Sequence, residues 1–196
     1  MFWNRPSSAV VFLTIGFAVA TNAQTQKSFP SNDEIHLVVS QAERAIQQYK
    51  PLIDREEAEL GARYTDAVAK DRQIVGGIET ALTAFKSKPQ AFNGPAGFLF
   101  FEWLDDAARN AVLCGSGAVS ESAVQITVGN VAKAQALVTL GHLCSDVGTL
   151  IYTVSENAGA LYQRYVEAEE QLATRATDIA QKCAEVLRKN SDPPRQ

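Results

Sequence analysis

Apolar residues recur at intervals of three and four positions along two long stretches of this 196-residue chain. The first stretch runs from Ile35 to Phe85 and the second from Val147 to Val186. This spacing places apolar side chains on one face of an α-helix, whereas a strand would alternate every second residue. Pro51 interrupts the first stretch, and a proline inside a helix removes a backbone hydrogen bond and clashes with the preceding turn. We therefore expect two long helices, the first either kinked just before Pro51 or divided into two at that residue.

Two shorter helices are expected between these stretches. Pro95 can open the first, which would end near Leu113, and the glycine-rich segment 114–118 is expected to form a turn. Ser120 would begin the second, which would end at a corner formed by residues 142–145.

These elements predict an all-α fold, an elongated antiparallel helical bundle with two long terminal helices and a shorter middle helical hairpin. The terminal helices, similar in length, would lie side by side, and the hairpin would pack on one end of that pair. The other end would resemble a two-helix coiled coil. Glu56 and Asp71 fall on the apolar stripe of the first stretch, so we expect an imperfect seam there.

The N-terminal segment has the composition of a secretory signal peptide. Arg5 precedes about a dozen apolar residues, too few to span a bilayer, and small residues then lead to a cleavage point after Ala23. We interpret residues 1–23 as the signal peptide, 24–31 as a flexible leader, 32–189 as a single helical-bundle domain and 190–196 as a disordered tail. The protein is thus expected to be periplasmic or secreted, with a bacterial source as the simplest interpretation and no stable membrane span after signal removal.

Composition narrows the classes of partner and chemistry. A net charge of −4 argues against nucleic acid as a partner, because a nucleic-acid binder needs a basic surface. Motifs typical of haem, di-iron, zinc, phosphate-loop and nucleophilic-serine sites are missing from the sequence. We therefore predict no catalytic residue, no cofactor and no metal site, and we expect that the protein is not an enzyme.

Three cysteines leave an odd one, and export makes disulfides permissible. The up-and-down arrangement above brings no pair close enough to bond. If the middle hairpin folds back differently, Cys114 and Cys144 form the best pair. The alternatives are buried free thiols, which suit Cys183 because it lies on the apolar stripe, and an intermolecular bridge.

The most distinctive segment is aromatic and follows a Gly-Pro loop. Its aromatic residues are Phe98, Phe100, Phe101 and Trp103. Aromatic side chains bury large areas and dominate both cores and interfaces. Two interpretations therefore remain open: the thick core of a four-helix end, or a contact site for a partner, a ligand or a membrane.

Two functional hypotheses follow. The first is an exported, non-enzymatic helical protein that acts through contacts with an envelope or extracellular protein, or with a second copy of itself, as a scaffold, adapter or appendage component. In outline it is similar to the small helical pilus-tip subunits of type IV secretion systems, a similarity that rests on the signal peptide, long helices and middle appendage alone. The second is a bundle that binds an apolar small ligand between the aromatic helix 98–104 and the Gly/Ala-rich helix 120–142.

Overall fold

The computed structural model describes residues 28–61 and 64–191, and all regular structure in these residues is helical. Four α-helices follow in order: α1 (Asn32–Leu60), α2 (Thr65–Ser87), α3 (Pro95–Thr127) and α4 (Val131–Ser191). A short 3₁₀ helix, η2 (Pro89–Phe92), connects α2 to α3. The predicted all-α class is confirmed. The expected signal peptide 1–23 lies outside the described residues.

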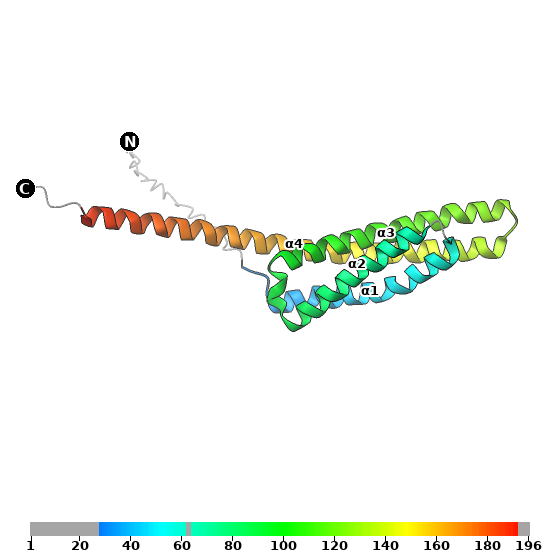
Figure 1. Ribbon diagram of the computed structural model, residues 1–196, viewed down its shortest axis with the longest axis horizontal. Helices are drawn as coiled ribbons and strands as arrows, with labels where there is room; N and C mark the ends of the chain where they lie inside the picture. Colours follow the sequence, from blue (N-terminus) through cyan, green and yellow to red (C-terminus); the bar gives the residue numbers. More distant parts are fainter. Residues whose placement is uncertain (1–27, 62–63, 192–196) are drawn as a thin grey trace, which may run out of the picture.

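The helices run up, down, up and down, so neighbours along the chain are antiparallel (Figure 1). α3 and α4 form the most extensive helix–helix contact, and α1 packs against both α4 and α2. The expected antiparallel contact between the first and last helices is present. Gln41 in α1 accepts a hydrogen bond from Asn157, and Glu34, about two turns earlier, pairs with Arg164 further along α4.

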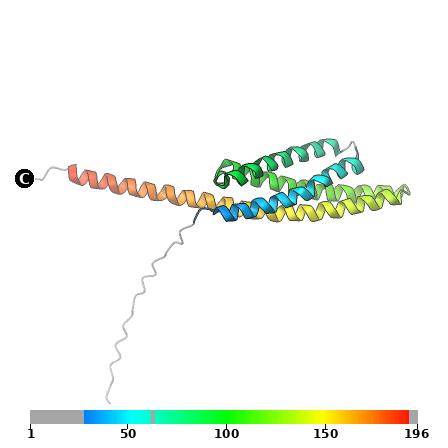
Figure 2. The same ribbon diagram turned by 90° about the horizontal axis from the view of Figure 1, so that it is seen from below.

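The helix lengths differ from the prediction, and this changes the shape. α4 has 61 residues, about 90 Å of helix, whereas α1 has only 29. The four-helix section lies in the middle of the molecule (Figure 1). At one end the α3–α4 hairpin extends beyond the α1–α2 turn, and at the other end the C-terminal part of α4 projects beyond the other described helices (Figure 2). The two-helix end is therefore built by α3 and α4, not by the first and last helices.

Pro51 does not divide the first helix, because α1 continues through it to Leu60. The break comes instead at Gly61, whose φ of 73° lies in the left-handed region that favours glycine. Tyr49, Leu52 and Ile53 are buried on either side of the proline. Their burial stabilises the helix where one backbone hydrogen bond is lost.

The predicted turn at 114–118 and the predicted corner at 142–145 are wrong, because both segments are helical. Glycine serves a different purpose here. A Cβ atom at Gly115 would lie 2.7 Å from the Ser145 hydroxyl oxygen and 3.1 Å from the Gly141 carbonyl oxygen. The missing side chains let α3 and α4 approach closely. The real turn between these helices contains Gly129, with a φ of 79°.

An aromatic cluster closes the end of the core where α2 turns into α3. Phe85, Phe92 and Phe100 are fully buried and meet edge to face, with ring centroids 5.3–6.3 Å apart. Such geometry is favourable beyond the area it buries. Pro30, from the segment predicted as a flexible leader, is buried, and Ser31 caps α1 with a capping box to Glu34.

Candidate functional site

The C-terminal part of α4 presents an apolar stripe to solvent. Every residue from 172 to 188, hereafter the projecting helix, is exposed. Leu172, Ile179 and Val186 are 51%, 62% and 57% exposed. Together with Ala176 and Cys183 they follow steps of four and three, which place them along one face. The projecting helix is about 25 Å long. Its apolar stripe has the spacing of a coiled-coil seam, but no other described helix of the bundle covers it.

The two edges of this seam differ in charge. On the heptad pattern defined by Leu172 and Ile179, Arg175 and Lys182 occupy equivalent positions along one edge. Ala173 and Ala180 occupy the other edge. The seam is therefore bordered by a basic row on one side and by small apolar side chains on the other.

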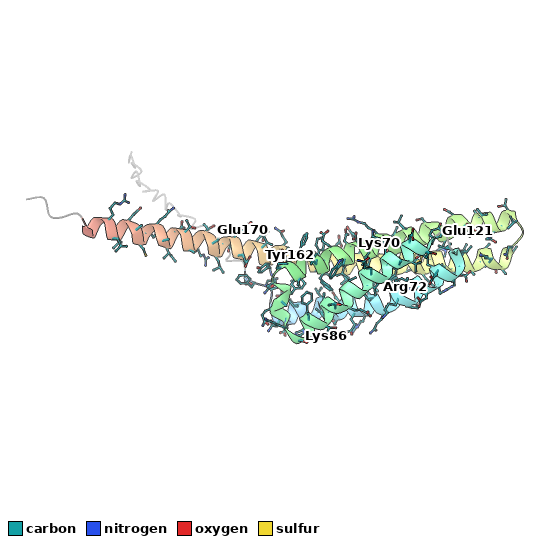
Figure 3. The ribbon with its side chains drawn as sticks, in the orientation of Figure 1. Lys70, Arg72, Lys86, Glu121, Tyr162 and Glu170 are labelled. Carbon is teal, nitrogen blue, oxygen red and sulfur yellow. A yellow bond between two sulfur atoms is a disulfide. The ribbon has the colours of Figure 1, made fainter. Side chains whose placement is uncertain are left out.

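A chain of aromatic rings supports α4 where it leaves the bundle. The Phe98 ring on α3 lies 5.7 Å from that of Tyr162, which in turn lies 5.9 Å from the ring of Tyr165. Phe29, from the segment before α1, adds a third contact at 5.9 Å from Tyr165. Figure 3 shows Tyr162 at this junction and Glu170 beyond it, on the way to the projecting helix.

An ion pair between α4 and the start of α1 lies at the same junction. The Arg164 guanidinium donates two hydrogen bonds to the Glu34 carboxylate, which also accepts from the Ser31 backbone and hydroxyl. These bonds, Arg164 first, lower the pKa of Glu34 to about 2. The start of α1 thus fixes the direction in which the projecting helix leaves the bundle.

The predicted aromatic residues divide between core and surface. Phe100 is fully buried, Trp103 packs over Gly77 of α2, and Phe101 packs over Gly159 of α4. Phe98 is 43% exposed and belongs to the ring chain at the junction. The aromatic segment is therefore mainly part of the core, and one of its members supports the projecting helix.

The structure does not bring the aromatic segment 98–104 to the Gly/Ala-rich segment 120–142. Residues 120–127 belong to the same helix as the aromatic segment, α3. Across the bundle, Phe101 faces Gly159 of α4, whereas Gly141 faces Gly115. The apolar ligand site proposed between these two segments does not form.

The structure joins Cys114 of α3 to Cys144 of α4 by a disulfide, with their Cα atoms 6.0 Å apart. This pairing arises because both helices continue through the predicted turn and corner, which aligns their middle sections. Cys183 is a free cysteine, and the expectation that it is buried is wrong. It lies on the projecting helix, where the apolar stripe has no bundle to face.

Exposed apolar residues also gather along the α3–α4 hairpin. One shallow groove of about 480 Å³ between these helices is lined by Val112, Leu113, Gly148 and Tyr152, among others. Among the described residues, the segment Val131–Arg188 is long and apolar enough to cross a membrane by length and composition, although 44% of its apolar window is buried inside the protein. This is weak evidence for a span, because buried core helices pass the same test. The expectation of no stable membrane span after signal removal therefore stays a prediction.

Two buried carboxylates lie between α1 and α2 and face α3. Glu56 is only 3% exposed and Asp71 only 2%. Asn110 donates a hydrogen bond to Asp71, whereas Oε2 of Glu56 has no hydrogen-bond partner. Burial, followed by the charge of Asp71, raises the pKa of Glu56 to about 7, and burial also raises the pKa of Asp71.

The hydroxyl of Tyr49 completes this buried cluster. Burial and the neighbouring Asp71 carboxylate raise the pKa of Tyr49 strongly, so this phenol stays protonated. Its geometry toward Asp71 falls short of a good hydrogen bond. The sequence signal for this cluster was the pair of acids on the apolar stripe, but a stripe alone does not indicate that Glu56 and Asp71 meet.

Comparisons with protein-family models, with curated proteins and with solved structures found no match. Among residues 28–61 and 64–191, no group of three His, Cys, Asp or Glu side chains is placed to hold a metal ion. The geometry of the described surfaces is therefore the basis for any functional assignment.

Proposed function

We propose that this protein is an exported, non-enzymatic helical adapter that binds another protein through its projecting helix. The observation that carries the proposal is the apolar stripe at Leu172, Ile179 and Val186, exposed on a helix that extends beyond the bundle. Contiguous exposed apolar surface typically marks an interaction site. Because this segment continues α4, its helical nucleation is already complete, and a partner helix would only have to cover the seam.

The charge along the seam favours a different protein over a second copy of this chain. In an antiparallel pair of two copies, the basic row of Arg175 and Lys182 would face itself. In a parallel pair the basic row would face Ala173 and Ala180 of the second copy, which carry no charge to complement it. An amphipathic helix with acidic residues along one edge matches both the apolar stripe and the basic row, and we assign this chemistry to the partner.

Export fits the covalent structure of the bundle. Disulfides persist in oxidising compartments and are rare in the cytosol. The pairing of Cys114 with Cys144 supports the signal-peptide interpretation of the N-terminal segment. A periplasmic or extracellular partner is the consequence.

A matched pair of variants tests the proposal. Ile179→Glu places a charge in the seam, whereas Gln181→Glu places the same charge two residues away, on the opposite side of the helix. Both positions are exposed, so both variants should unfold at the wild-type temperature. Immobilised wild-type protein and Gln181→Glu should retain the same envelope protein, and Ile179→Glu should lose it. Equal retention by all three would contradict a role for the seam.

The apolar groove between α3 and α4 favours a second candidate function, the binding of an apolar small molecule. Its volume of about 480 Å³ lies within the range of ligand sites, and its lining is almost entirely apolar. Native mass spectrometry of the protein from its own cells tests this. A bound hydrophobic molecule that is lost in Leu113→Glu, in the groove, but retained in Val124→Glu, outside it, would support this candidate. A ligand-free wild-type protein would argue against it.

A further inference from the structure

The buried acidic pair belongs to the lining of a pocket that nothing in the helical-adapter proposal uses. The pocket has a volume of about 580 Å³ and lies between the α1–α2 region and α3. Glu56 and Asp71 line it together with Asn110, and Ser116 and Ser120 contribute hydroxyl groups from α3. Its volume is typical of sites for small molecules.

We propose that this pocket binds a small organic cation, whose ammonium group lies between Glu56 and Asp71. Both side chains are at least 97% buried, and Oε2 of Glu56 is left without a hydrogen-bond donor. A buried acceptor without a donor costs free energy, and a buried carboxylate costs more. An ammonium group supplies both the positive charge and up to three donors.

The arrangement of the pocket favours an ammonium ion over a metal ion. Divalent metals in proteins take several oxygen ligands, and calcium takes six to eight. The described lining of this pocket has only two acidic residues. Asn110 donates a hydrogen bond to Asp71 and so holds this carboxylate in position as an acceptor. Side-chain hydroxyls on the α3 wall can accept hydrogen bonds from a polar ligand. The apolar wall near Leu113 and Cys114 suits a short alkyl chain.

Lys70, a cation among the described residues that line the pocket, does not fill this role in the structure. Lys70 lines the pocket from α2, where Figure 3 labels it, but its side chain is exposed. Its charge lowers the pKa of Asp71 by less than burial raises it. The ammonium group of Lys70 thus leaves Oε2 of Glu56 without a donor.

Propylammonium chloride is the probe for this site, with propanol as a neutral control and sodium chloride at matched ionic strength. At pH 8, thermal unfolding of the wild-type protein should shift upward by about 3 °C at a tenfold excess over the dissociation constant. A ligand with so few atoms is expected to bind only in the millimolar range, so the titration extends to roughly 100 mM. Propanol and sodium chloride should give no comparable shift.

Two variants on α1 place the binding at the pocket. Glu56→Gln should weaken propylammonium binding at least tenfold, measured by calorimetry, because it removes the buried charge. Glu59→Gln, three residues away and outside the pocket lining, should bind as the wild type does. Asp71→Asn provides a second pocket variant with the same expected loss. No shift with propylammonium, an equal shift in Glu56→Gln, or a larger shift with calcium chloride would overturn the proposal.

Discussion

Removing the charge of Glu56 should stabilise the protein at neutral and alkaline pH. The carboxyl group is 3% exposed, its Oε2 has no hydrogen-bond partner, and Asp71 adds a second negative charge nearby. The substitution Glu56→Gln keeps the shape of the side chain and replaces an acid with a neutral amide. We expect the variant to fold as the wild type does and to differ from it mainly in the pH dependence of its stability.

The size of the effect follows from the pKa shift. Burial and Asp71 raise the pKa of Glu56 from 4.5 to about 7. Between these values the folded protein retains a proton that the unfolded chain has released, so the free energy of unfolding falls as pH rises. At 1.36 kcal/mol per pKa unit, the shift corresponds to about 3 kcal/mol, lost between pH 4.5 and 7 and absent thereafter. The Glu56→Gln variant should avoid this loss and be about 3 kcal/mol more stable than the wild type at pH 8.

Urea unfolding, followed by circular dichroism between pH 5 and pH 8, measures this directly. The wild-type midpoint should fall with rising pH, whereas that of Glu56→Gln should fall much less, with similar urea dependence in both proteins. Glu59→Gln, on the same helix, should follow the wild type. If Glu56→Gln kept the wild-type slope, or were less stable than the wild type at pH 8, the account of a destabilising buried charge would be refuted.

Three further predictions concern the bundle itself. Arg164→Met should lower the free energy of unfolding by about 0.5–1 kcal/mol at pH 7, a small value because the paired side chains are 32% and 42% exposed. The pKa of Glu34 is lowered only in the folded state, so the stabilisation by this ion pair should be present above about pH 4.5 and disappear toward pH 2. Acid titration of the stability of both proteins measures this. The disulfide between α3 and α4 joins residues 30 positions apart, so reducing it should lower the free energy of unfolding by about 3.5 kcal/mol. Urea unfolding with reductant measures this, and an unchanged midpoint would contradict it. Gly97→Ala should lower the unfolding temperature, because its Cβ would lie 2.0 Å from the carbonyl oxygen of Phe92, whereas Gly76→Ala, with open space around it, should raise it slightly; the reverse order would contradict the packing described.

The sequence predicts the fold class and the start of α3 at Pro95, but not the positions of the turns after α1 and α3. Glycine and proline indicate breaks in a helical pattern, yet Pro51 and Gly115 lie inside helices, whereas Gly61 and Gly129 mark the real turns. A glycine that permits a positive φ and a glycine that permits close helix packing look the same in a sequence. Only the neighbouring helix distinguishes them, and the neighbour is a property of the folded chain.

The candidate sites were predictable to different degrees for the same reason. The heptad-like spacing from Leu172 to Val186 is visible in the sequence, but its exposure depends on α1 being much shorter than α4. Glu56 and Asp71 stand out as acids on an apolar stripe, whereas their meeting at one pocket depends on the turn at Gly61 that folds α2 back onto α1. Periodicity identifies the face on which a residue lies, and tertiary packing decides what lies opposite that face.

Site-specific photo-crosslinking in the cells that produce the protein tests the projecting helix most directly. A photo-reactive amino acid is placed at position 179, in the seam, and in a separate strain at position 181, on the opposite side of the same helix. We predict an adduct with a different protein from position 179 and none from position 181. Adducts of equal yield from both positions, no adduct from either, or an adduct of twice the mass of the chain would contradict the assignment of this helix to a foreign partner.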